Sequence, residues 1–127
     1  QALLDVLPAG VMLQSTTGRI LKANPAAHAI LGAPPGTLPG QDTRAARWST
    51  VDAEGRPLPD EQRPVARVLA TGLPSDHTRV GVRNDRGEQR WLDLRCVPLA
   101  GPDGSLEGAL TCFNDVTDAV RTDALLQ

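Results

Sequence analysis

The sequence predicts an α+β domain in which helices cover one face of an antiparallel sheet. Strand-like runs at both ends of the chain flank a helical middle, and this order indicates an α+β sheet rather than alternating βαβ units. The last two runs, Glu88–Ala100 and Ser105–Asn114, are joined by Gly101-Pro102-Asp103-Gly104 and are interpreted as a long hairpin. At 127 residues the chain has the length of a single domain.

The first part of the chain is expected to contain a short apolar helix, two strands and a capped helix. The first three elements are expected at Ala2–Leu7, Val11–Gln14 and Arg19–Ala23. The side chain of Asn24 can then accept hydrogen bonds from the free amides of a helix, and Pro25 suits the first helical position. Gly32 is expected to end this helix, with Ile30 and Leu31 facing inward.

The middle of the chain is less regular. Ala33–Pro59 is rich in Pro, Gly and polar residues and is expected to form loops and one or two short helical turns, with Trp48 as an anchor. Asp60 is expected to cap the next helix, which ends at Gly72. The apolar face of that helix recurs at i, i+3 and i+4: Val65, Val68 and Leu69.

A third strand is expected at Thr78–Asn84, which brings the sheet to five strands. Asp85-Arg86-Gly87 after it is interpreted as a three-residue hairpin loop with Gly87 in the left-handed conformation. Because side chains alternate along a strand, this loop length places Val80 opposite Leu92.

The long hairpin is expected to turn through a four-residue loop, Gly101–Gly104, which pairs Ala100 with Ser105. The pairs that follow are Leu92 with Phe113, Leu94 with Thr111 and Cys96 with Ala109. The face that they share is assigned to the helices and to any internal pocket. Its candidate pocket residues are Val80, Val82, Leu92, Leu94, Cys96, Ala109, Thr111 and Phe113, joined by Ile30 and Leu69 from the helices.

The opposite face of the sheet is a candidate dimer face. Its apolar residues near the turn are Val97, Leu99, Leu106 and Leu110. Such a group is too apolar to be left in water, so we expect the N-terminal helix, a second subunit or both to cover it. Cys96 and Cys112 lie on opposite faces in this register, which excludes disulfide geometry and favours two ordinary apolar residues.

Several segments share the order and spacing of a known family. They include Leu7-Pro8-Ala9-Gly10-Val11, Gly18-Arg19-Ile20, Ala23-Asn24-Pro25-Ala26-Ala27, Leu31-Gly32, Asp52-Ala53-Glu54-Gly55-Arg56-Pro57-Leu58-Pro59, Ala70-Thr71-Gly72, Arg90-Trp91-Leu92 and Asp115-Val116-Thr117. Over residues 3–118 they resemble PAS domains, the small sensor modules of signalling proteins. One departure is that an acidic residue common before the family's first turn is replaced by Ser15 or Thr16.

The resemblance implies a five-stranded antiparallel sheet, helices on one face, a small-molecule cavity between them and a flanking helix at each end. The domain limits are then residues 1–9 for the N-terminal flanking helix, 10–116 for the PAS domain and 117–127 for the start of a C-terminal signalling helix. Asp115 and Thr117 align with the family's Asp-x-Thr output motif and are the candidate signal relay. A plain helix cap explains these two residues equally well, and the two roles are compatible.

The resemblance also implies a non-catalytic sensor of bacterial type that binds a small ligand or mediates dimerisation. Its partners would be a second copy of the chain and a downstream effector domain in the same protein: a histidine kinase of a two-component system, a diguanylate cyclase or a phosphatase. Two alternatives stay open. A ligand-free dimerisation module would lack a cavity of about 300 Å³, and an enzyme on a similar scaffold would need a nucleophile or an acid/base pair in a cleft.

No cofactor or metal is predicted, although the sequence leaves room for an unknown small molecule. Haem-binding members of the family carry a histidine on the helix before the third strand, and Glu61–Thr71 contains none. His28 and His77 are therefore expected in surface or capping roles. The flavin-binding branch carries a cysteine on a middle helix, and no cysteine lies between residues 1 and 95.

Composition argues against several kinds of partner. The net charge is −2, and the arginines are scattered among acids rather than gathered in the basic stripe of a nucleic-acid-binding protein. No apolar run approaches the ~18 residues of a membrane span, and the first residues lack a basic leader, so no membrane contact is expected from this segment. Two cysteines favour a reducing, cytoplasmic setting. Because the chain begins with Gln1, we expect it to be part of a longer protein.

Overall fold

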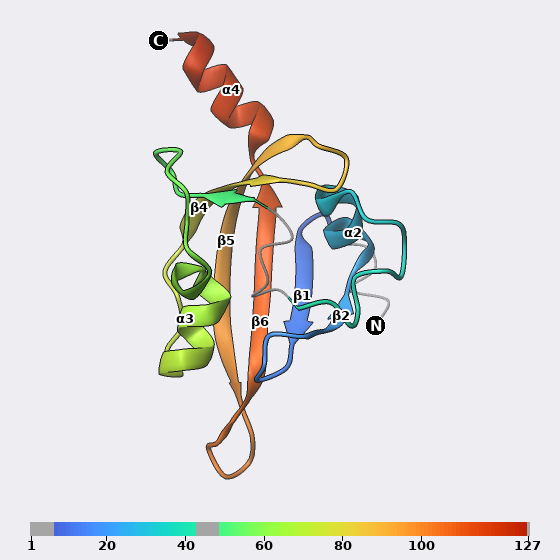
Figure 1. Cartoon of the computed structure of the whole chain (residues 1–127), viewed down its shortest axis with the longest axis vertical. Helices are drawn as coiled ribbons and strands as arrows, with labels where there is room; N and C mark the ends of the chain where they lie inside the picture. Colours follow the sequence, from blue (N-terminus) through green and yellow to red (C-terminus); the bar gives the residue numbers. More distant parts are fainter. Residues whose placement is uncertain (1–6, 43–48, 127) are drawn as a thin grey trace.

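The computed structural model of the chain describes residues 7–42 and 49–126, and of residues 124–126 it describes the backbone alone. Its centre is an antiparallel sheet with the strand order β2-β1-β6-β5-β4-β3 (Figure 1). The strands are β1 (Gly10–Gln14), β2 (Ile20–Ala23), β3 (Thr50–Val51), β4 (Thr78–Arg83), β5 (Gln89–Ala100) and β6 (Leu106–Asp115). The helical elements are α2 (Pro25–Leu31), the 3-10 turn η1 (Asp60–Gln62), α3 (Pro64–Thr71) and α4 (Thr117–Leu126). The predicted α+β class is confirmed.

The sheet has six strands, one more than the sequence predicts. The additional strand, β3, pairs antiparallel with β4, so that Thr50 lies opposite Val82 and Val51 lies opposite Gly81. It falls in the Pro- and Gly-rich segment for which the sequence predicts only loops and helical turns. Two residues are too few to show an alternating pattern, which is why the strand escapes detection.

Two expectations fall mainly on residues outside the described part of the chain. These are the anchor role of Trp48 and the N-terminal flanking helix over residues 1–9. Within that second segment the structure describes Leu7, Pro8 and Ala9, and these three residues are not helical.

Helix α2 begins where the sequence predicts, because Asn24 caps it. The side-chain oxygen of Asn24 accepts hydrogen bonds from the amide of Ala27 at 3.0 Å and from the amide of Val11 at 2.9 Å. Its side-chain nitrogen donates to the carbonyl of Ala9 at 2.9 Å. Gly32, with a φ of 71°, ends the helix in the left-handed conformation. One buried side chain therefore ties the start of α2 to the start of β1.

Asp60 does not cap α3, contrary to the prediction. Asp60 opens the separate turn η1, and the residue before α3 is Arg63, which is extended and provides no side-chain cap. Pro64 explains the shift, because the residue before a proline disfavours the helical conformation and proline suits the first helical position. The apolar positions of α3 are still the predicted ones: Val65 and Val68 are buried, and Leu69 is partly buried.

The β4–β5 hairpin has the predicted register. Val80 lies opposite Leu92, and the amide of Asn84 donates to the carbonyl of Glu88 at 2.9 Å. Gly87 has a φ of 78°, a conformation that costs a glycine little because it has no Cβ.

The register of the long β5–β6 hairpin differs from the prediction by two residues. Ala100 pairs with Leu106 instead of Ser105, and a bulge then adds a second extra residue, so that Leu99 pairs with Gly108. The observed pairs are Leu94 with Phe113, Cys96 with Thr111 and Pro98 with Ala109, so the predicted pairs Leu92–Phe113, Leu94–Thr111 and Cys96–Ala109 are wrong. From Leu92 to Leu99 the offset is two, an even number, so these side chains and their partners keep their predicted faces. At the turn the offset is one, so Leu106 lies opposite Ala100 and does not keep the outer face predicted for it.

The turn and the bulge each have a local cause. The carboxylate of Asp103 accepts a hydrogen bond from the amide of Ser105 at 3.0 Å, which holds Ser105 in the turn. At Gly108, β6 approaches β1 so closely that a Cβ would lie 2.2 Å from the carbonyl oxygen of Gln14. Only glycine fits such an approach.

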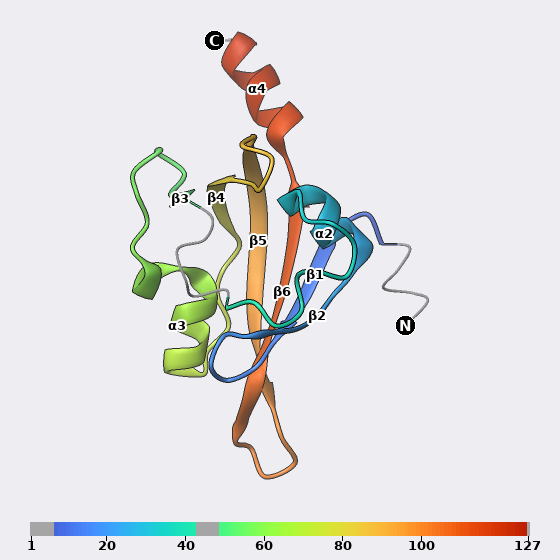
Figure 2. The same ribbon diagram turned by 45° about the vertical axis from the view of Figure 1, so that its right-hand side comes forward.

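Helices α2 and α3 lie on the same side of the sheet, where α2 packs on β1 and α3 packs on β5 and β6 (Figure 2). The larger core cluster contains Met12, Ile20, Ala27, Leu31, Ala33, Leu38, Val80, Val82, Leu92 and Phe113. A smaller cluster beneath α3 contains Val65, Val68, Cys96 and Ala109. Each fully buried Val, Leu, Ile or Phe contributes roughly 1.5–3 kcal/mol, so these two clusters hold the helices to the sheet.

Helix α4 projects beyond the ends of β5 and β6, away from the other helices (Figures 1 and 2). Its contacts with the rest of the domain are mainly with β5. In the part of the chain that the structure describes, no helix combines the length and the apolar composition that a membrane crossing requires.

Candidate functional site

A pocket of about 90 Å³ lies between the inner face of the sheet and the start of α3. The predicted pocket residues that line it are Val80, Val82, Leu92, Leu94, Thr111 and Phe113. Cys96 and Ala109 lie on the same face but are enclosed beneath α3, and Ile30 and Leu69 pack at the edges of the two core clusters. The structure therefore brings six of the ten predicted residues to the pocket wall.

Several wall residues are absent from the sequence-based set. They are Met12, Gln14, Leu31, Thr50, Arg63, Pro64 and Val65. Met12 and Gln14 alternate on β1, so the face of that strand is a signal that points to them. Arg63 gives no such signal, because it stands in an irregular stretch before a proline.

Two polar side chains in the pocket wall come from adjacent strands. The hydroxyl of Thr111 in β6 lies 3.1 Å from the side-chain oxygen of Gln14 in β1, and both side chains are buried. If the amide of Gln14 is turned over, it still pairs with Thr111 and also donates to the carbonyls of Met12 and Ala109. Thr111 also contacts the sulfur of Cys96 at 3.4 Å. These buried polar groups are thus satisfied, as buried groups must be.

Arg63 brings a positive charge to the pocket wall. Its side chain is 9% exposed, and its Nε lies 3.5 Å from a carboxylate oxygen of Asp60, whose own side chain is 49% exposed. Burial lowers the pKa of Arg63, and the charge of Asp60 partly opposes that effect. An arginine keeps its proton under such conditions, so the pocket wall carries a cation.

The two cysteines are free and differ in surroundings. Cys96 is buried on the inner face, and burial raises the pKa of its thiol, while the hydrogen bond from Thr111 acts in the opposite direction. Cys112 is exposed on the outer face, opposite Arg95 across the strand pair. The thiols therefore lie on opposite faces, as predicted, and neither has the depressed pKa of a reactive nucleophile.

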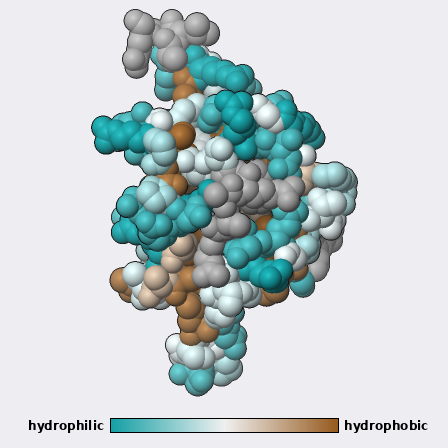
Figure 3. Space-filling model, in the orientation of Figure 1, coloured by the Kyte–Doolittle hydropathy of each residue, from teal (hydrophilic) through white to brown (hydrophobic). Residues whose placement is uncertain are grey.

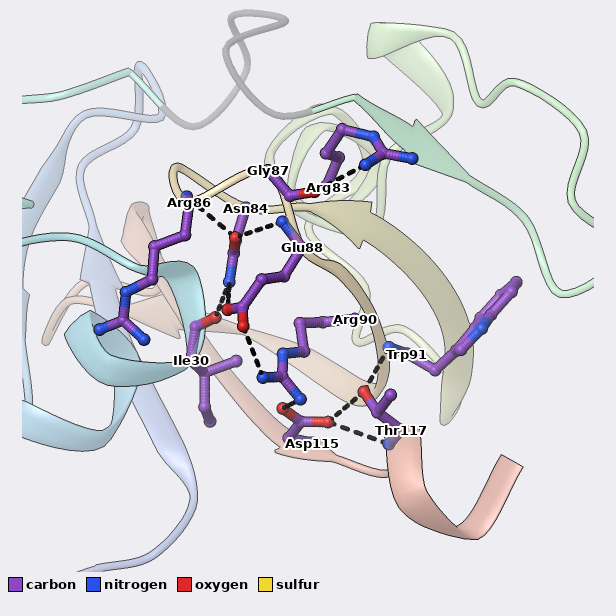
Figure 4. Close-up of polar contacts among 10 residues, drawn as sticks. All are labelled: Ile30, Arg83, Asn84, Arg86, Gly87, Glu88, Arg90, Trp91, Asp115 and Thr117. Atoms are coloured by element: carbon purple, nitrogen blue, oxygen red, sulfur yellow. Dashed lines mark hydrogen bonds and ion pairs between the residues drawn. The ribbon is translucent and has the colours of Figure 1, made fainter. Parts of the chain in front are cut away.

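A set of polar contacts joins the start of α4 to the sheet. Within this set, Asp115 contacts both Arg90 and Thr117 (Figure 4). The carboxylate of Asp115 accepts hydrogen bonds from the amide of Thr117 at 2.9 Å and from the hydroxyl of Thr117. The other carboxylate oxygen lies 3.7 Å from the guanidinium of Arg90. The hydroxyl of Thr117 in turn accepts from the amide of Trp91 at 2.9 Å. The two candidate relay residues are thus bonded to each other and to β5.

The same chain of polar contacts continues to the end of α2 (Figure 4). Arg90 donates to the carboxylate of Glu88 at 3.2 Å, and Asn84 donates to the other oxygen of that carboxylate at 3.0 Å. Asn84 also contacts the carbonyl of Ile30 at 3.1 Å. The hydrogen bond from Asn84, together with Arg90, lowers the pKa of Glu88, while desolvation opposes this effect. The carboxyl end of α2 and the amino end of α4 are therefore linked through the β4–β5 hairpin.

The candidate dimer face is apolar near the long turn. Val97, Leu99 and Leu110 are half-buried, and Leu13 of β1 extends the group because it lies opposite Leu110. Leu106 is also half-buried but lies opposite Ala100, so the bulge takes it off the predicted face. Figure 3 views the domain from the side that carries α2 and α3, and hydrophobic surface is visible there below α3, on the β5–β6 hairpin. Towards the other end the face becomes polar, where Arg79 makes two hydrogen bonds to the carboxylate of Asp93, at 2.7 and 3.0 Å, and lowers its pKa.

His28 is buried, which corrects the expected surface or capping role. Its Nδ1 lies 3.0 Å from the carbonyl of Asn24, and its Nε2 accepts a hydrogen bond from the amide of Leu38 at 3.2 Å. Both ring nitrogens thus hold backbone groups, which ties the loop after α2 to the helix. His77 is exposed. Within residues 7–42 and 49–126, no three side chains of His, Cys, Asp or Glu are grouped as ligands of a metal ion would be.

Larger hollows of about 410, 530 and 370 Å³ lie on the described surface. Charged side chains from exposed segments line each of them, such as Asp76 and Arg79 in the first and Asp60 and Glu61 in the second. The small pocket remains the better candidate for a ligand site, because the inner face of the sheet forms it and its wall is mostly apolar.

Comparison with known proteins identifies relatives of this fold. A family model described as the PAS fold matches residues 4–121. None of the curated proteins compared with the chain matches it.

Several solved structures share the architecture at low identity. The PAS domain of a protein from Colwellia psychrerythraea aligns with a TM-score of 0.71 and 18% identity, covering 92% of this chain and 93% of that one. The PAS domain of the fruit-fly ELK potassium channel gives 0.72 and 13%, covering 91% and 93%. The PAS domain of nitrogen regulation protein NR(II) from Vibrio parahaemolyticus gives 0.65 and 16%, covering 90% and 94%. At these identities the likeness is one of fold.

Proposed function

The chain belongs to the PAS family, and we propose that it is the non-catalytic input domain of a signalling protein, which regulates an effector domain that follows α4. The observation that carries this proposal is the junction of Asp115 and Thr117 with β5. A terminal helix held by a hydrogen-bonded strand end is suited to report a change in the sheet to whatever the helix leads into.

The pocket and the junction are adjacent along β5. Leu92 lines the pocket and lies directly opposite Asp115 across the β5–β6 pair. The preceding residue, Trp91, supplies the amide that Thr117 accepts. A ligand that repacks Leu92 would therefore displace the strand that holds α4.

We also propose that the domain works as a homodimer in the cytoplasm of a bacterial cell, with a histidine kinase, diguanylate cyclase or phosphatase as effector. The apolar outer face supports dimerisation. Two free cysteines favour a reducing compartment. The likeness to a PAS domain from a bacterial nitrogen regulation protein favours the signalling setting.

The test is to measure effector activity of the full-length parent protein, with and without its stimulus, in the double variant Asp115→Ala and Thr117→Ala. The double variant should stay folded and lose the response to the stimulus. The matched control is Asp118→Ala with Thr122→Ala, which changes the same residue types at exposed positions of α4. If the double variant folds and its effector activity still responds normally to the stimulus, Asp115 and Thr117 act only as a helix cap.

A ligand-free dimerisation module remains the second candidate, because the pocket measures about 90 Å³ and typical ligand pockets measure about 300–1,000 Å³. Native mass spectrometry of the purified protein separates the two functions, since it reports subunit number and any co-purified ligand together. A dimer with no bound molecule, unaffected by candidate ligands, would favour this second function.

A further inference from the structure

One edge of the sheet is open beside α3. The short strand β3 covers only the far end of β4, where Val51 lies opposite Gly81. The chain then turns back at Asp52, whose amide donates to the carbonyl of Arg56 at 2.8 Å. In the part of the chain that the structure describes, no residue pairs with Thr78–Val80 on that side. The first part of β4 is therefore an unpaired strand edge.

The backbone of Arg79 points to this open edge. Along an antiparallel strand, successive residues bond alternately to the strands on either side. Asn84 bonds to β5, since its amide donates to the carbonyl of Glu88 at 2.9 Å, and Arg83 bonds to the other side, since its amide donates to the carbonyl of Ser49 at 3.0 Å. Arg79 has the same parity as Arg83, so its N–H and C=O face away from β5, and neither has a partner among the described residues.

The hollow of about 410 Å³ lies between this edge and α3, which runs beside the start of β4 (Figures 1 and 2). The open part of β4 forms one wall, and one face of α3 forms the other. The residues of that helix face are Pro64, Arg67, Val68 and Thr71, at i, i+3, i+4 and i+7. Because the side chain of Arg79 bonds to Asp93 on the outer face of the sheet, Arg79 offers its backbone to the hollow.

Arg67 brings a positive charge to the helix wall of the hollow. Its side chain is exposed, and it has no ion-pair partner in the described part of the chain. Two acids also line the hollow, but neither lies on α3. Asp52 uses one carboxylate oxygen to accept the amides of Glu54 and Arg56, each at 2.9 Å, and Asp76 lies in the loop before β4. The α3 wall is therefore cationic and complementary to a carboxylate.

An extended peptide matches both walls. In an antiparallel pair, two opposite residues exchange both of their backbone hydrogen bonds, and Arg79 offers one free donor and one free acceptor. An exposed strand edge of this kind is a template for pairing with another chain. Because side chains alternate along a strand, the peptide residue opposite Arg79 would face the outer side of the sheet, and its neighbours would face α3. An acidic side chain on such a neighbour points towards Arg67.

We propose that the hollow between α3 and β4 binds an extended segment of a partner protein, which adds antiparallel to β4 at Arg79 and places an acidic side chain at Arg67. The volume of the hollow lies within the range of about 300–1,000 Å³ that is typical of ligand sites. This docking site is distinct from the small pocket, from the apolar outer face and from the junction of Asp115 and Thr117, so it does not depend on the proposed sensing role.

The first experiment titrates the 127-residue chain with the peptide acetyl-Thr-Val-Glu-Val-Thr-amide and follows backbone amide shifts by NMR. The peptide should bind in saturable fashion in the millimolar range, shift the amides of Arg79 and Arg67, and slow hydrogen exchange at the amide of Arg79. Replacing its glutamate with glutamine should weaken binding about two- to fivefold, as expected for an exposed ion pair, and lysine should weaken it further. N-methylation of both valines should abolish binding, because it removes the N–H groups that face β4.

Three variants complete the test. Arg67→Gln should bind the glutamate and glutamine peptides equally, because the charge that distinguishes them is gone. Arg79→Pro should abolish binding, since proline has no N–H, while the sheet stays intact because that N–H is not bonded to β5. The matched control is Arg79→Ala, which also loses the contact with Asp93 but keeps the N–H and should still bind the peptide.

Several results would overturn the proposed docking site. They are equal binding of the N-methylated and unmodified peptides, equal binding by Arg79→Pro and Arg79→Ala, amide shifts confined to the outer face of the sheet, and no saturable binding of any peptide at millimolar concentration. The comparison of the peptides uses the unaltered chain, so it decides the matter even if Arg79→Pro does not fold. The signalling role is tested separately, by the response of the full-length protein to changes at Asp115 and Thr117.

Discussion

The hydroxyl oxygen of Thr117 accepts a 2.9 Å hydrogen bond from the backbone amide of Trp91, 26 residues earlier in the chain. The same hydroxyl donates to the carboxylate of Asp115, and the Thr117 side chain is almost completely buried. The amide of Val116 donates to the carbonyl of Trp91 at 2.8 Å, so both backbone groups of Trp91 are held by the start of α4. Thr117 is thus both part of a helix cap and a fastening between the helix and the sheet.

Replacing Thr117 with valine should lower the free energy of unfolding by about 1–3 kcal/mol, because the amide of Trp91 would lose its acceptor at a buried position. Hydrogen exchange at that amide should accelerate by a corresponding factor. Thr122→Val, at an exposed position of α4, is the matched control and should change stability by less than about 0.5 kcal/mol. Unchanged exchange at Trp91 would show that water replaces the hydroxyl without cost.

Replacing Asn24 with alanine should destabilise the domain by about 2–3 kcal/mol, as measured by urea unfolding. The change removes the cap of α2 and the side-chain bonds to Val11 and Ala9. Asn114→Ala, at an exposed position of β6, should have little effect. A loss below 1 kcal/mol would indicate that α2 does not depend on this residue.

The two thiols should react at very different rates. Cys112 is exposed and should be labelled rapidly by a thiol reagent, whereas Cys96 should react at least about a hundredfold more slowly until the chain unfolds. Complete unfolding without reductant should reveal two free thiols. A variant with Cys112→Ser isolates the slow thiol, and rapid labelling of that variant would mean that the region beneath α3 opens readily.

Stability should also fall at alkaline pH. Because burial raises the pKa of Cys96 in the folded state, its contribution is fully present below the unfolded thiol pKa of about 8.5 and is lost as pH rises through the folded value. The slope can reach about 1.4 kcal/mol per pH unit. The chain has no tyrosine, but burial also raises the pKa of the Cys112 thiol, so Cys112 contributes in the same direction. Cys96→Ala should flatten the pH dependence in urea unfolding, and an unchanged slope would exclude Cys96 as its source.

Replacing Leu110 with arginine should shift the protein towards monomer in sedimentation velocity experiments. Leu110 lies at the centre of the apolar outer face, and a charge buried there without a partner opposes association. Ser105→Arg, in the exposed turn, introduces the same charge away from that face and should leave the dimer intact. A monomeric unaltered protein would remove the basis of this prediction.

The sequence determined the faces of the sheet more securely than its register. The prediction for the β5–β6 hairpin missed the fifth turn residue, Ser105, and the bulge at Gly108. Neither has a marker in the alternating pattern, since one depends on an Asx contact and the other on a close approach between two strands. The two errors cancel in parity, which is why the inward residues were assigned to the inner side.

The sequence did not predict the positions of His28 and Arg63, because both positions depend on irregular segments of the chain. His28 is buried because the loop residue Leu38 donates to it, and nothing periodic places Leu38 there. Arg63 stands before Pro64 in a stretch without a repeating pattern, so its place in the pocket wall follows only from tertiary structure. Asp115 and Thr117 were identified through their resemblance to the family's Asp-x-Thr motif, and the structure shows them hydrogen-bonded to each other and to β5.

Helix α4 projects away from the rest of the domain and contacts mainly β5, so a tilt at its first residue is amplified along its length. Its ten residues extend about 15 Å from a fulcrum at Thr117, and a tilt of about 10° there would move the far end by about 2.5 Å. Every further turn of helix beyond residue 126 would lengthen the arm by about 5.4 Å and increase the stroke in proportion. A displacement of β5 too small to alter the fold of the domain would thus become a movement large enough to change how the ends of two such helices meet.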